Sequence, residues 1–285
     1  MKYGCVVLTT GSRPEVLALA VESLLAQRDV ELDVVVVFNG AQPSALPERA
    51  QGLGLAEDVG IPAARNAGAR QVSGELLFFL DDDASLVGDD ALVRVAQRFA
   101  DDPSLGAAQL GVVPRDGGAY SRDWVPRLRV GDRTRPSDVA VLWEGAVAVR
   151  RSTFELVGGW PGEFRFVHEG VDLAWRILDA GFRVHYAGDI EALHPPPAPV
   201  AAGERHAYSS YYGARNRVWL ARRHLPLPLG ALFVASFAAR TLPRVNARAA
   251  LRGYRDGVRG PFPERQKLRA RTLWRMTRAG RPPVI

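Results

Sequence analysis

Apolar and polar residues alternate along the first half of the chain in two distinct patterns. Continuous apolar runs are typical of strands buried on both faces of a sheet, and they predict strands at 4–9, 32–38, 75–80 and 106–113. Between these runs, apolar residues recur every three or four positions, which predicts helices at 14–25, 62–72 and 89–100. Strands that alternate with helices indicate an α/β fold with a mainly parallel central sheet and helices on both faces.

The first of these helices carries a start signal. Ser12 and Glu15 have the spacing of a capping box, in which two side chains bond each other's backbone N–H groups. Pro14 is tolerated in a first helical turn because the N–H that it lacks has no helical partner there. We therefore expect Ser12 to cap this helix.

The second half of the chain has weaker patterns. We expect a long loop over 117–138, strands over 139–150 and 183–187, and helices over 151–157, 168–180 and 206–224. Gly181, directly after one of these helices, is a common stop signal. A proline run at 195–199 marks the predicted edge of the first domain. The chain thus divides into an α/β domain at 1–200 and a basic helical extension at 201–285.

Charge is divided unevenly between these two parts. The 285 residues carry a formal net charge of +6 and a pI of about 9.9, and 47% of them are hydrophobic. This composition excludes a disordered chain, and the single Cys5 excludes an intrachain disulfide or a cysteine zinc site. Residues 203–285 have a net charge of +15, whereas residues 1–202 have one of −9. Such a basic tail favours nucleic acid or an anionic membrane surface as a partner.

The hydropathy pattern contains no evident targeting or membrane-spanning segment. The chain enters a predicted strand directly after Met1 and Lys2, unlike a signal peptide. The longest uncharged apolar stretch, 225–239, contains two prolines and is shorter than the ~20 residues that a spanning helix needs. We therefore expect a cytoplasmic protein, peripheral on the cytoplasmic face of a membrane if its tail binds lipid.

Three consecutive carboxylates, Asp81, Asp82 and Asp83, follow the third predicted strand. Ligands of open α/β sheets bind at the carboxyl ends of the strands. Packed like charges repel one another unless a cation offsets them, and carboxylate oxygens suit Mg²⁺ or Mn²⁺, which bridge to phosphates. The sequence therefore predicts a metal and phosphate site here, with a solvated acidic turn as the alternative.

Together these segments resemble a family-2 inverting glycosyltransferase with the GT-A fold, of the kind that builds bacterial cell-envelope polysaccharides. The matching stretches are VVLTTGSRPEVLALAVESLLAQ, VVVVFNG, GIPAARNAG, GELLFFLDDDASL, EGAVAVRRSTFELVGGW, HEGVDLAWRILDAGFRVHY and EALH, which span roughly residues 3–195. The resemblance implies a nucleotide-sugar half at about 1–115 and an acceptor half at about 116–200. It also implies transfer of a sugar from a UDP- or dTDP-sugar to a saccharide or lipid-linked acceptor, with inversion.

The resemblance implies roles for residues on the nucleotide side. It places six of them beside the nucleotide and diphosphate: Thr9, Thr10, Gly11, Asn39, Arg65 and Asn66. Asn39 stands where the family often has an aspartate near the base and ribose. Asp81 and Asp83 match the outer acids of an Asp-x-Asp motif that binds the metal and the sugar diphosphate, with Asp82 between them. His194 matches a histidine that adds a late ligand to the Mn²⁺ or Mg²⁺ ion.

The segment HEGVDL matches the part of the family that carries the general base. Glu169 and Asp172 are three residues apart and share one helical face, and a base must reach the acceptor hydroxyl. The family usually has Glu-Asp-x-Asp-Leu here, with the first aspartate as base, but this chain has Gly170 at that position. Glu169 is our first candidate and Asp172 our second; either one alternatively offsets the helix dipole. His168 would tune Glu169 or bind the acceptor.

Other residues point to the acceptor side. Gly145 permits close backbone approach to a ligand, and Trp160 offers an indole face on which a sugar stacks, with core packing as its alternative. Arg215 and Asn216, in the first tail helix, would face the acceptor or its phosphate.

Beyond that helix, six arginines recur every three or four residues, at 240, 244, 248, 252, 255 and 259. On a single helix they would form one broad face, a pattern that favours an anionic membrane surface. The alternatives are a solvated face and a contact within a homo-oligomer.

Three other functions stay open on the sequence. A nucleotidyltransferase on a related α/β scaffold would also use acidic metal ligands, although the HEGVDL helix argues against it. A nucleic-acid binder would use the basic tail, but carboxylates at the ligand edge disfavour it, so we expect no nucleic-acid partner. An inactive sugar-nucleotide-binding protein is suggested by Gly170.

Overall fold

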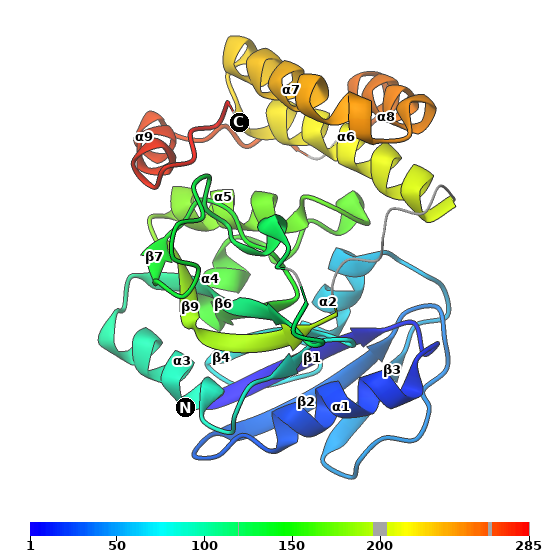
Figure 1. The fold of residues 1–285 in the computed structure, drawn as a ribbon, viewed down its shortest axis with the longest axis vertical. Coiled ribbons are helices and arrows are strands. Elements are labelled where there is room, and N and C mark those ends of the chain that lie inside the picture. The colour runs from blue at the N-terminus through cyan, green and yellow to red at the C-terminus, as the bar shows by residue number, and fades with distance from the viewer. Residues whose placement is uncertain (119, 196–203, 262–263, 285) are drawn as a thin grey trace.

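The computed structural model describes residues 1–118, 120–195, 204–261 and 264–284. A large mixed sheet with helices on both faces forms one part, and a group of helices lies against one end of it (Figure 1). Most of the proline run predicted as the domain edge, 196–199, lies outside the described residues.

The strands and helices largely follow the predicted order. The strands are β1 Lys2–Thr9, β2 Glu31–Phe38, β3 Ala50–Gly54, β4 Leu76–Asp81, β5 Ser85–Leu86, β6 Leu105–Pro114, β7 Ser137–Asp138, β8 Ala146–Arg150 and β9 Arg183–His194. The helices are α1 Pro14–Leu25, α2 Ile61–Ala69, α3 Ala91–Asp101, α4 Arg151–Leu156, α5 Glu169–Ala180, α6 Glu204–His224, α7 Leu227–Thr241, α8 Ala247–Arg259 and α9 Ala270–Arg278.

The sheet has the strand order β3-β2-β1-β4-β8-β6-β9-β5, and β7 pairs with β9. The strands from β3 to β4 are parallel to their neighbours, as are β6 and β9, whereas β8 is antiparallel to both β4 and β6. The sheet is therefore less uniformly parallel than expected. Because β8 is antiparallel to both of its neighbours, β6 and β9 run in the same direction as β4. The carboxyl ends of β4, β6 and β9 therefore lie at one edge of the sheet.

Both faces of the sheet are buried, which explains the continuous apolar runs. Along β4, Leu77 and Phe79 join the core under α2, α4 and α5, while Leu76, Phe78 and Leu80 join the core under α1 and α3. A strand with a core on each side needs apolar residues at every position. The expectation of helices on both faces is confirmed.

Several local predictions were wrong for physical reasons. Ser12 does not cap α1: the N-cap residue is Arg13 and its side chain makes no cap hydrogen bond, while the Ser12 hydroxyl lies 2.9 Å from that of Thr10. Of the strand predicted at 139–150 only Ala146–Arg150 forms. The N–H of Trp143 instead donates to the Gln109 side chain, so this apolar segment is buried without a strand ladder.

The sheet also contains one strand that is longer than predicted, β9, and one strand that was not predicted, β3. β9 extends to His194 because its pairing with β6 shifts register around Gly188, which lets the strand continue past a bulge. β3 was not predicted because AQGLG lacks an apolar run, and it forms by pairing with β2.

The tail is helical, as predicted, but its arginines do not share one face of one helix. A 3₁₀ turn at Leu242–Arg244 separates α7 from α8, so Arg240 lies on α7 and Arg248 on α8. α8 packs closely on α6 at Gly253 and Gly257, where a Cβ atom would overlap Tyr211 and Val218 of α6. Within the described part of the chain, no helix has the length and apolarity to span a bilayer.

Two helical glycines test this packing. A Cβ at Gly68 in α2 would lie 2.5 Å from the Val6 side chain of β1, whereas one at Gly213 in α6 would meet no atom within 4 Å. We expect Gly68→Ala to lower the free energy of unfolding by about 1–3 kcal/mol through overpacking. Gly213→Ala is the matched control and should stabilise the protein by a few tenths of a kcal/mol to about 1 kcal/mol. Urea unfolding measures both; equal effects would contradict the close approach of α2 to β1.

Candidate functional site

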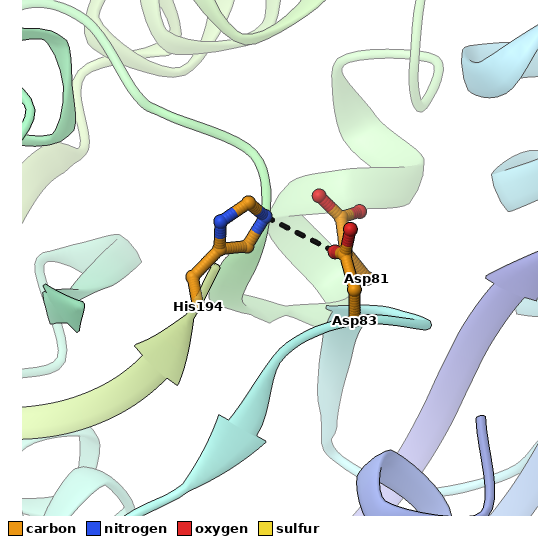
Figure 2. A group of neighbouring side chains, drawn as sticks. All are labelled: Asp81, Asp83 and His194. Atoms are coloured by element: carbon orange, nitrogen blue, oxygen red, sulfur yellow. Dashed lines mark ion pairs between the residues drawn. The ribbon is translucent and has the colours of Figure 1, made fainter. Parts of the chain in front are cut away.

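Two strand ends bring Asp81, Asp83 and His194 together. Asp81 ends β4, Asp83 follows in the next turn, and His194 ends β9 at the same edge of the sheet (Figure 2). Their ligand atoms lie within 4.8 Å of one another, and the Nε2 atom of His194 lies 3.1 Å from an oxygen of Asp83. The structure thus assembles the three residues predicted as metal ligands.

The His194 ring is held in a fixed orientation. Its Nδ1 donates to the Pro195 carbonyl oxygen at 2.6 Å, which leaves Nε2 facing the carboxylates. The rings of Trp143 and Trp124 pack edge-on against it, with centroids 5.1 and 5.7 Å away. Such support of the second nitrogen is typical of a metal-binding histidine.

Arginines and the histidine offset the repulsion among the carboxylates. Burial alone would raise the pKa of Asp83, but His194 and Arg13 outweigh it and lower that pKa to about 2. An Arg65 nitrogen lies 2.6 Å from an oxygen of Asp81, and Arg13 bonds both Asp82 and Asp83. Asp83 is therefore ionised at neutral pH.

The side chains of Asp82 and Thr9 are hydrogen-bonded to each other. The Thr9 hydroxyl donates to Asp82 at 2.6 Å and also accepts the Gly11 N–H at 3.0 Å. Burial raises the pKa of Asp82. These bonds tie the end of β4 to the end of β1, and they leave the exposed Thr10 and Gly11 free to meet a ligand.

Asn39 shapes the start of α2 rather than standing open at the surface. Its amide donates to Asp58 at 2.7 Å and its oxygen accepts the Val59 N–H at 3.0 Å. Asp58 also accepts the Gly60 N–H, and its carboxylate stays largely exposed at this edge. Asp58 was not predicted, because no apolar strand or motif precedes it in the sequence.

Arg65 and Asn66 lie at the site, but only Arg65 faces the carboxylates. Asn66 exchanges two hydrogen bonds with the Trp160 backbone, at 2.8 and 2.9 Å. The Trp160 indole is 2% exposed and packs against Phe79 and Phe154, while the Arg65 guanidinium lies 5.1 Å from its centre. The prediction that Trp160 stacks on a sugar is wrong, since its faces are in the core.

Two carboxyls, the half-buried Glu144 and the buried Glu169, lie next to this group. The Gly170 N–H donates to Glu144 at 2.6 Å, and a Cβ at Gly170 would overlap the same Glu144 oxygen. Burial, then the charge of Glu169, raises the pKa of Glu144 to about 8, and Arg65 opposes the rise. Burial raises the pKa of Glu169 as well. The Glu144 carboxyl thus occupies the space that an acidic side chain at position 170 would need.

Glu144 was not among the residues predicted for the site. Its position in the chain is informative: Trp143 packs on His194, and the Gly145 carbonyl accepts the Asp81 N–H at 3.0 Å. The neighbours of Glu144 on both sides therefore touch the metal-ligand group. Gly145 itself lacks a side chain because the Trp143 ring fills that space, so its predicted role in approaching a ligand is not supported.

Asp172 is a structural residue, and the prediction that it is a candidate base is wrong. It is fully buried, and Arg176 and His224 bond its two oxygens at 2.6 and 2.7 Å. Burial alone would raise the pKa of Asp172, but Arg176 and His224 hold it well below its usual range. The two His224 nitrogens lie 2.7 Å from an Asp172 oxygen and 2.9 Å from the Gln266 carbonyl oxygen. The pair joins α5 to α6.

Arg215 and Asn216 also hold the domains together instead of facing an acceptor. The Asn216 amide donates to the carbonyls of Phe164, Phe166 and Val167, at 2.7–2.9 Å. Val167 and His168 have positive φ angles of 66° and 71°, a strained conformation for residues other than glycine. Asn216 therefore stabilises the strained turn that presents His168 and Glu169.

A cavity of about 550 Å³ opens where the α/β domain meets the tail. Glu144, His168 and Trp175 line it from the α/β domain, while Phe237 of α7 and Arg281 line it from the tail. Burial, then the charge of Arg217, lowers the pKa of His168 to about 3, so its ring is neutral. His168 and Glu144 thus line the same cavity.

The chain is similar to known proteins in both sequence and fold. The model of Glycosyl transferase family 2 matches residues 5–158. The chain is 30% identical over 250 residues to the O-antigen biosynthesis protein RfbC of Myxococcus xanthus, a match that covers 75% of this chain. The chain spans 19% of the length of this curated relative.

Two structures with the same arrangement of sheet and helices have low sequence identity to the chain. TarS of S. aureus superposes with a TM-score of 0.59 at 15% identity, over 87% of this chain and 45% of TarS; a further TarS structure is a complex with UDP-GlcNAc. The mannosyltransferase PcManGT of Pyrobaculum calidifontis, in complex with GDP-Man and Mn²⁺, gives a TM-score of 0.57 at 20% identity, over 92% of this chain and 76% of PcManGT. The expected GT-A fold is confirmed.

The structural role of Asp172 can be tested by its effect on stability. Asp172→Asn removes a buried charge and leaves Arg176 and His224 uncompensated, so we expect the free energy of unfolding to fall by about 3–5 kcal/mol. The exposed Asp116→Asn is the control and should stay within about 0.5 kcal/mol of the parent. Urea unfolding followed by circular dichroism measures both, and an unchanged midpoint for Asp172→Asn would refute the ion-pair assignment.

Proposed function

The chain belongs to glycosyl transferase family 2, and on that basis we propose that its site transfers a sugar from a nucleoside-diphosphate sugar to an acceptor hydroxyl with inversion. The observation that carries this proposal is the convergence of Asp81, Asp83 and His194 at the sheet edge. Glu144 lies one residue away from the Gly145 carbonyl that bonds Asp81. The residues that would bind a cation and the carboxyl that would accept a proton thus lie side by side.

Asp81, Asp83 and His194 are the residues that would hold a divalent cation. Two carboxylate oxygens and an imidazole nitrogen whose partner nitrogen is already bonded suit Mn²⁺ or Mg²⁺. A bound cation of this kind offsets negative charge on a departing diphosphate. Around it, Thr10 and Gly11 would meet the nucleotide, and Arg65 orients Asp81 through their 2.6 Å ion pair.

The donor that we propose is a UDP- or dTDP-sugar. The complexes of TarS with UDP-GlcNAc and of PcManGT with GDP-Man support a nucleoside-diphosphate sugar as the donor class. The relationship to RfbC supports a role in the synthesis of a cell-envelope polysaccharide. The acceptor would be a saccharide or a lipid-linked glycan, met at the cytoplasmic face of the membrane.

Glu144 is the general base in this proposal. One of its oxygens accepts the Gly170 N–H, which orients the carboxyl and leaves the second oxygen for an acceptor hydroxyl. As the acceptor oxygen bonds to the anomeric carbon, the bond to the diphosphate breaks on the opposite side and Glu144 takes the hydroxyl proton. This single displacement inverts the anomeric centre. Glu169, our first candidate from the sequence, is only 4% exposed. In this proposal it acts indirectly, because its charge raises the pKa of Glu144.

The metal site can be tested with Asp83→Ala. We expect this variant to lose sugar transfer and the Mn²⁺-dependent binding of UDP-sugars, because it removes a ligand with no nearby replacement. Isothermal titration with UDP-GlcNAc, with and without Mn²⁺, measures the binding, and chelation by EDTA should have the same effect on the parent protein. Asp101→Ala, at an exposed helix end far from the site, is the control and should bind normally.

The products formed decide between the proposed reaction and its alternatives. Release of a nucleoside diphosphate with a glycosylated acceptor supports the proposal. Release of pyrophosphate from a nucleoside triphosphate would identify a nucleotidyltransferase instead, and donor binding without hydrolysis or transfer would identify an inactive binding protein. Normal metal-dependent binding by Asp83→Ala would overturn the metal-site assignment.

The base can be tested by comparing Glu144→Gln and Glu169→Gln. We expect kcat to fall by about 10²–10⁴-fold in Glu144→Gln, with little change in donor KM, and by less in Glu169→Gln. In the parent protein, kcat/KM should rise with pH and level off above about 8, because Glu144 accepts a proton only when ionised. The groups that face it are Glu169 and Arg65.

The control for these variants is Glu155→Gln, a largely exposed carboxyl on α4. It should leave both kcat and the pH profile unchanged. A normal rate in Glu144→Gln would show that another group takes the acceptor proton.

A further inference from the structure

The cavity between the α/β domain and the tail is lined by both acidic and basic side chains. Glu144, beside the metal-ligand group, lines one part of it. Arg217 of α6, Arg240 of α7 and Arg281 line another. At about 550 Å³ the cavity is large enough for a ligand of several rings or a short chain.

The three arginines concentrate positive charge in this cavity. Arg217 is 5% exposed, and it donates to the Phe233 carbonyl oxygen at 3.3 Å. Burial, then the charges of Arg240 and Arg281, lowers the pKa of Arg217 to about 8. Among the described residues, none of the three arginines forms an ion pair with a carboxylate, and the acid that affects Arg281 is Asp123.

Such an arrangement is costly without an anion. Two other buried arginines are offset by carboxylates, since Arg65 pairs with Asp81 and Arg176 with Asp172, whereas the buried Arg127 and Arg215 donate to backbone carbonyl or amide oxygens. Arg217 is buried, and the nearby charges of the exposed Arg240 and the half-buried Arg281 disfavour its charged form. Guanidinium groups bind phosphate through several charge-assisted hydrogen bonds, which makes phosphate a fitting counter-charge.

The rest of the lining is apolar and aromatic. Phe233 and Phe237 lie under the Arg217 guanidinium, which is 3.2 and 4.7 Å from their ring centres. Trp175 and Val171 continue the apolar wall toward Glu144. A ligand that fits this surface combines an anionic group with an apolar or ring-shaped body.

We propose that this cavity is the acceptor site and that the acceptor carries a phosphate group. Arg217, Arg240 and Arg281 bind the phosphate, the aromatic wall holds the adjoining body, and the acceptor hydroxyl reaches Glu144. The proposal rests on the proposed sugar transfer and adds the chemical class of its acceptor. The phosphate belongs either to a lipid-linked acceptor or to a phosphorylated saccharide.

Binding of phosphate-bearing probes tests the proposal directly. We expect the full chain, without added metal, to bind farnesyl phosphate at least about tenfold more tightly than farnesol, because charge-assisted hydrogen bonds to phosphate are lost in the alcohol. Glucose 6-phosphate, compared with glucose, is the soluble arm. A larger gain for farnesyl phosphate supports a lipid-linked acceptor, and a larger gain for glucose 6-phosphate supports a phosphorylated saccharide. Equal binding of both phosphates and their uncharged partners would overturn the proposal.

Variants locate that binding in the cavity. Arg240→Gln and Arg281→Gln should each weaken binding of the preferred phosphate probe by about tenfold, and Arg217→Gln by at least as much. Arg240 is exposed, so its substitution should leave folding intact even if Arg217→Gln does not fold. Arg248→Gln, an exposed arginine on α8 outside the cavity, is the matched control.

The donor site provides an independent readout. UDP-GlcNAc binding in the presence of Mn²⁺ should be unchanged in Arg240→Gln and Arg281→Gln. If these variants bind the phosphate probe as the parent does, the acceptor proposal fails while the donor site stands. If the parent protein shows no metal-dependent donor binding, the proposed function fails instead.

Discussion

Repulsion among carboxylates is the constraint on which the rest of this site depends. Asp81, Asp83 and Glu144 are brought to one sheet edge by the end of β4 and the residues before β8, and burial by itself would raise the pKa of Asp83 and of Glu144. Arg13, Arg65 and His194 offset that effect unequally, so Asp83 is held ionised while the pKa of Glu144 rises to about 8. The same few residues therefore give two neighbouring carboxyls different pKa values, as the proposed metal ligand and the proposed base require.

The tail completes the acceptor side of the molecule. Asp172 and His224 fasten α6 to α5 through a buried ion pair, and Asn216 of α6 holds the strained turn before Glu169. Because α6 is fixed in this way, α7 is placed over His168, with the rings of His168 and Phe237 5.5 Å apart. The cavity that we propose as the acceptor site is consequently lined by both the α/β domain and the basic tail.

The elements that the sequence predicted well are those whose signal is local. Continuous apolar runs gave β1, β2 and β4, and the Gly181 stop signal matches the end of α5. Asp81 and Asp83 were predicted from their place after a strand and from the family resemblance, whereas His194 was predicted from the resemblance alone. The misassigned residues, Asp172, Trp160 and Asn216, are polar or aromatic groups that look alike in sequence whether they bind a ligand or hold the core together. Only their partners distinguish the two cases, and each of these residues has at least one partner 50 or more residues away in the sequence.

The sequence by itself determined the α/β class, the helical tail and the separation of acidic and basic charge, because periodicity and residue order encode them directly. The tertiary structure alone decided which acid lies beside Asp81 and His194. Gly170 has no side chain, and the carboxyl of Glu144, which lies 26 residues earlier in the sequence, occupies the space beside it in the folded chain. It also decided that three arginines scattered over residues 217–281 share one cavity, since their separation in sequence carries no sign of their closeness in space.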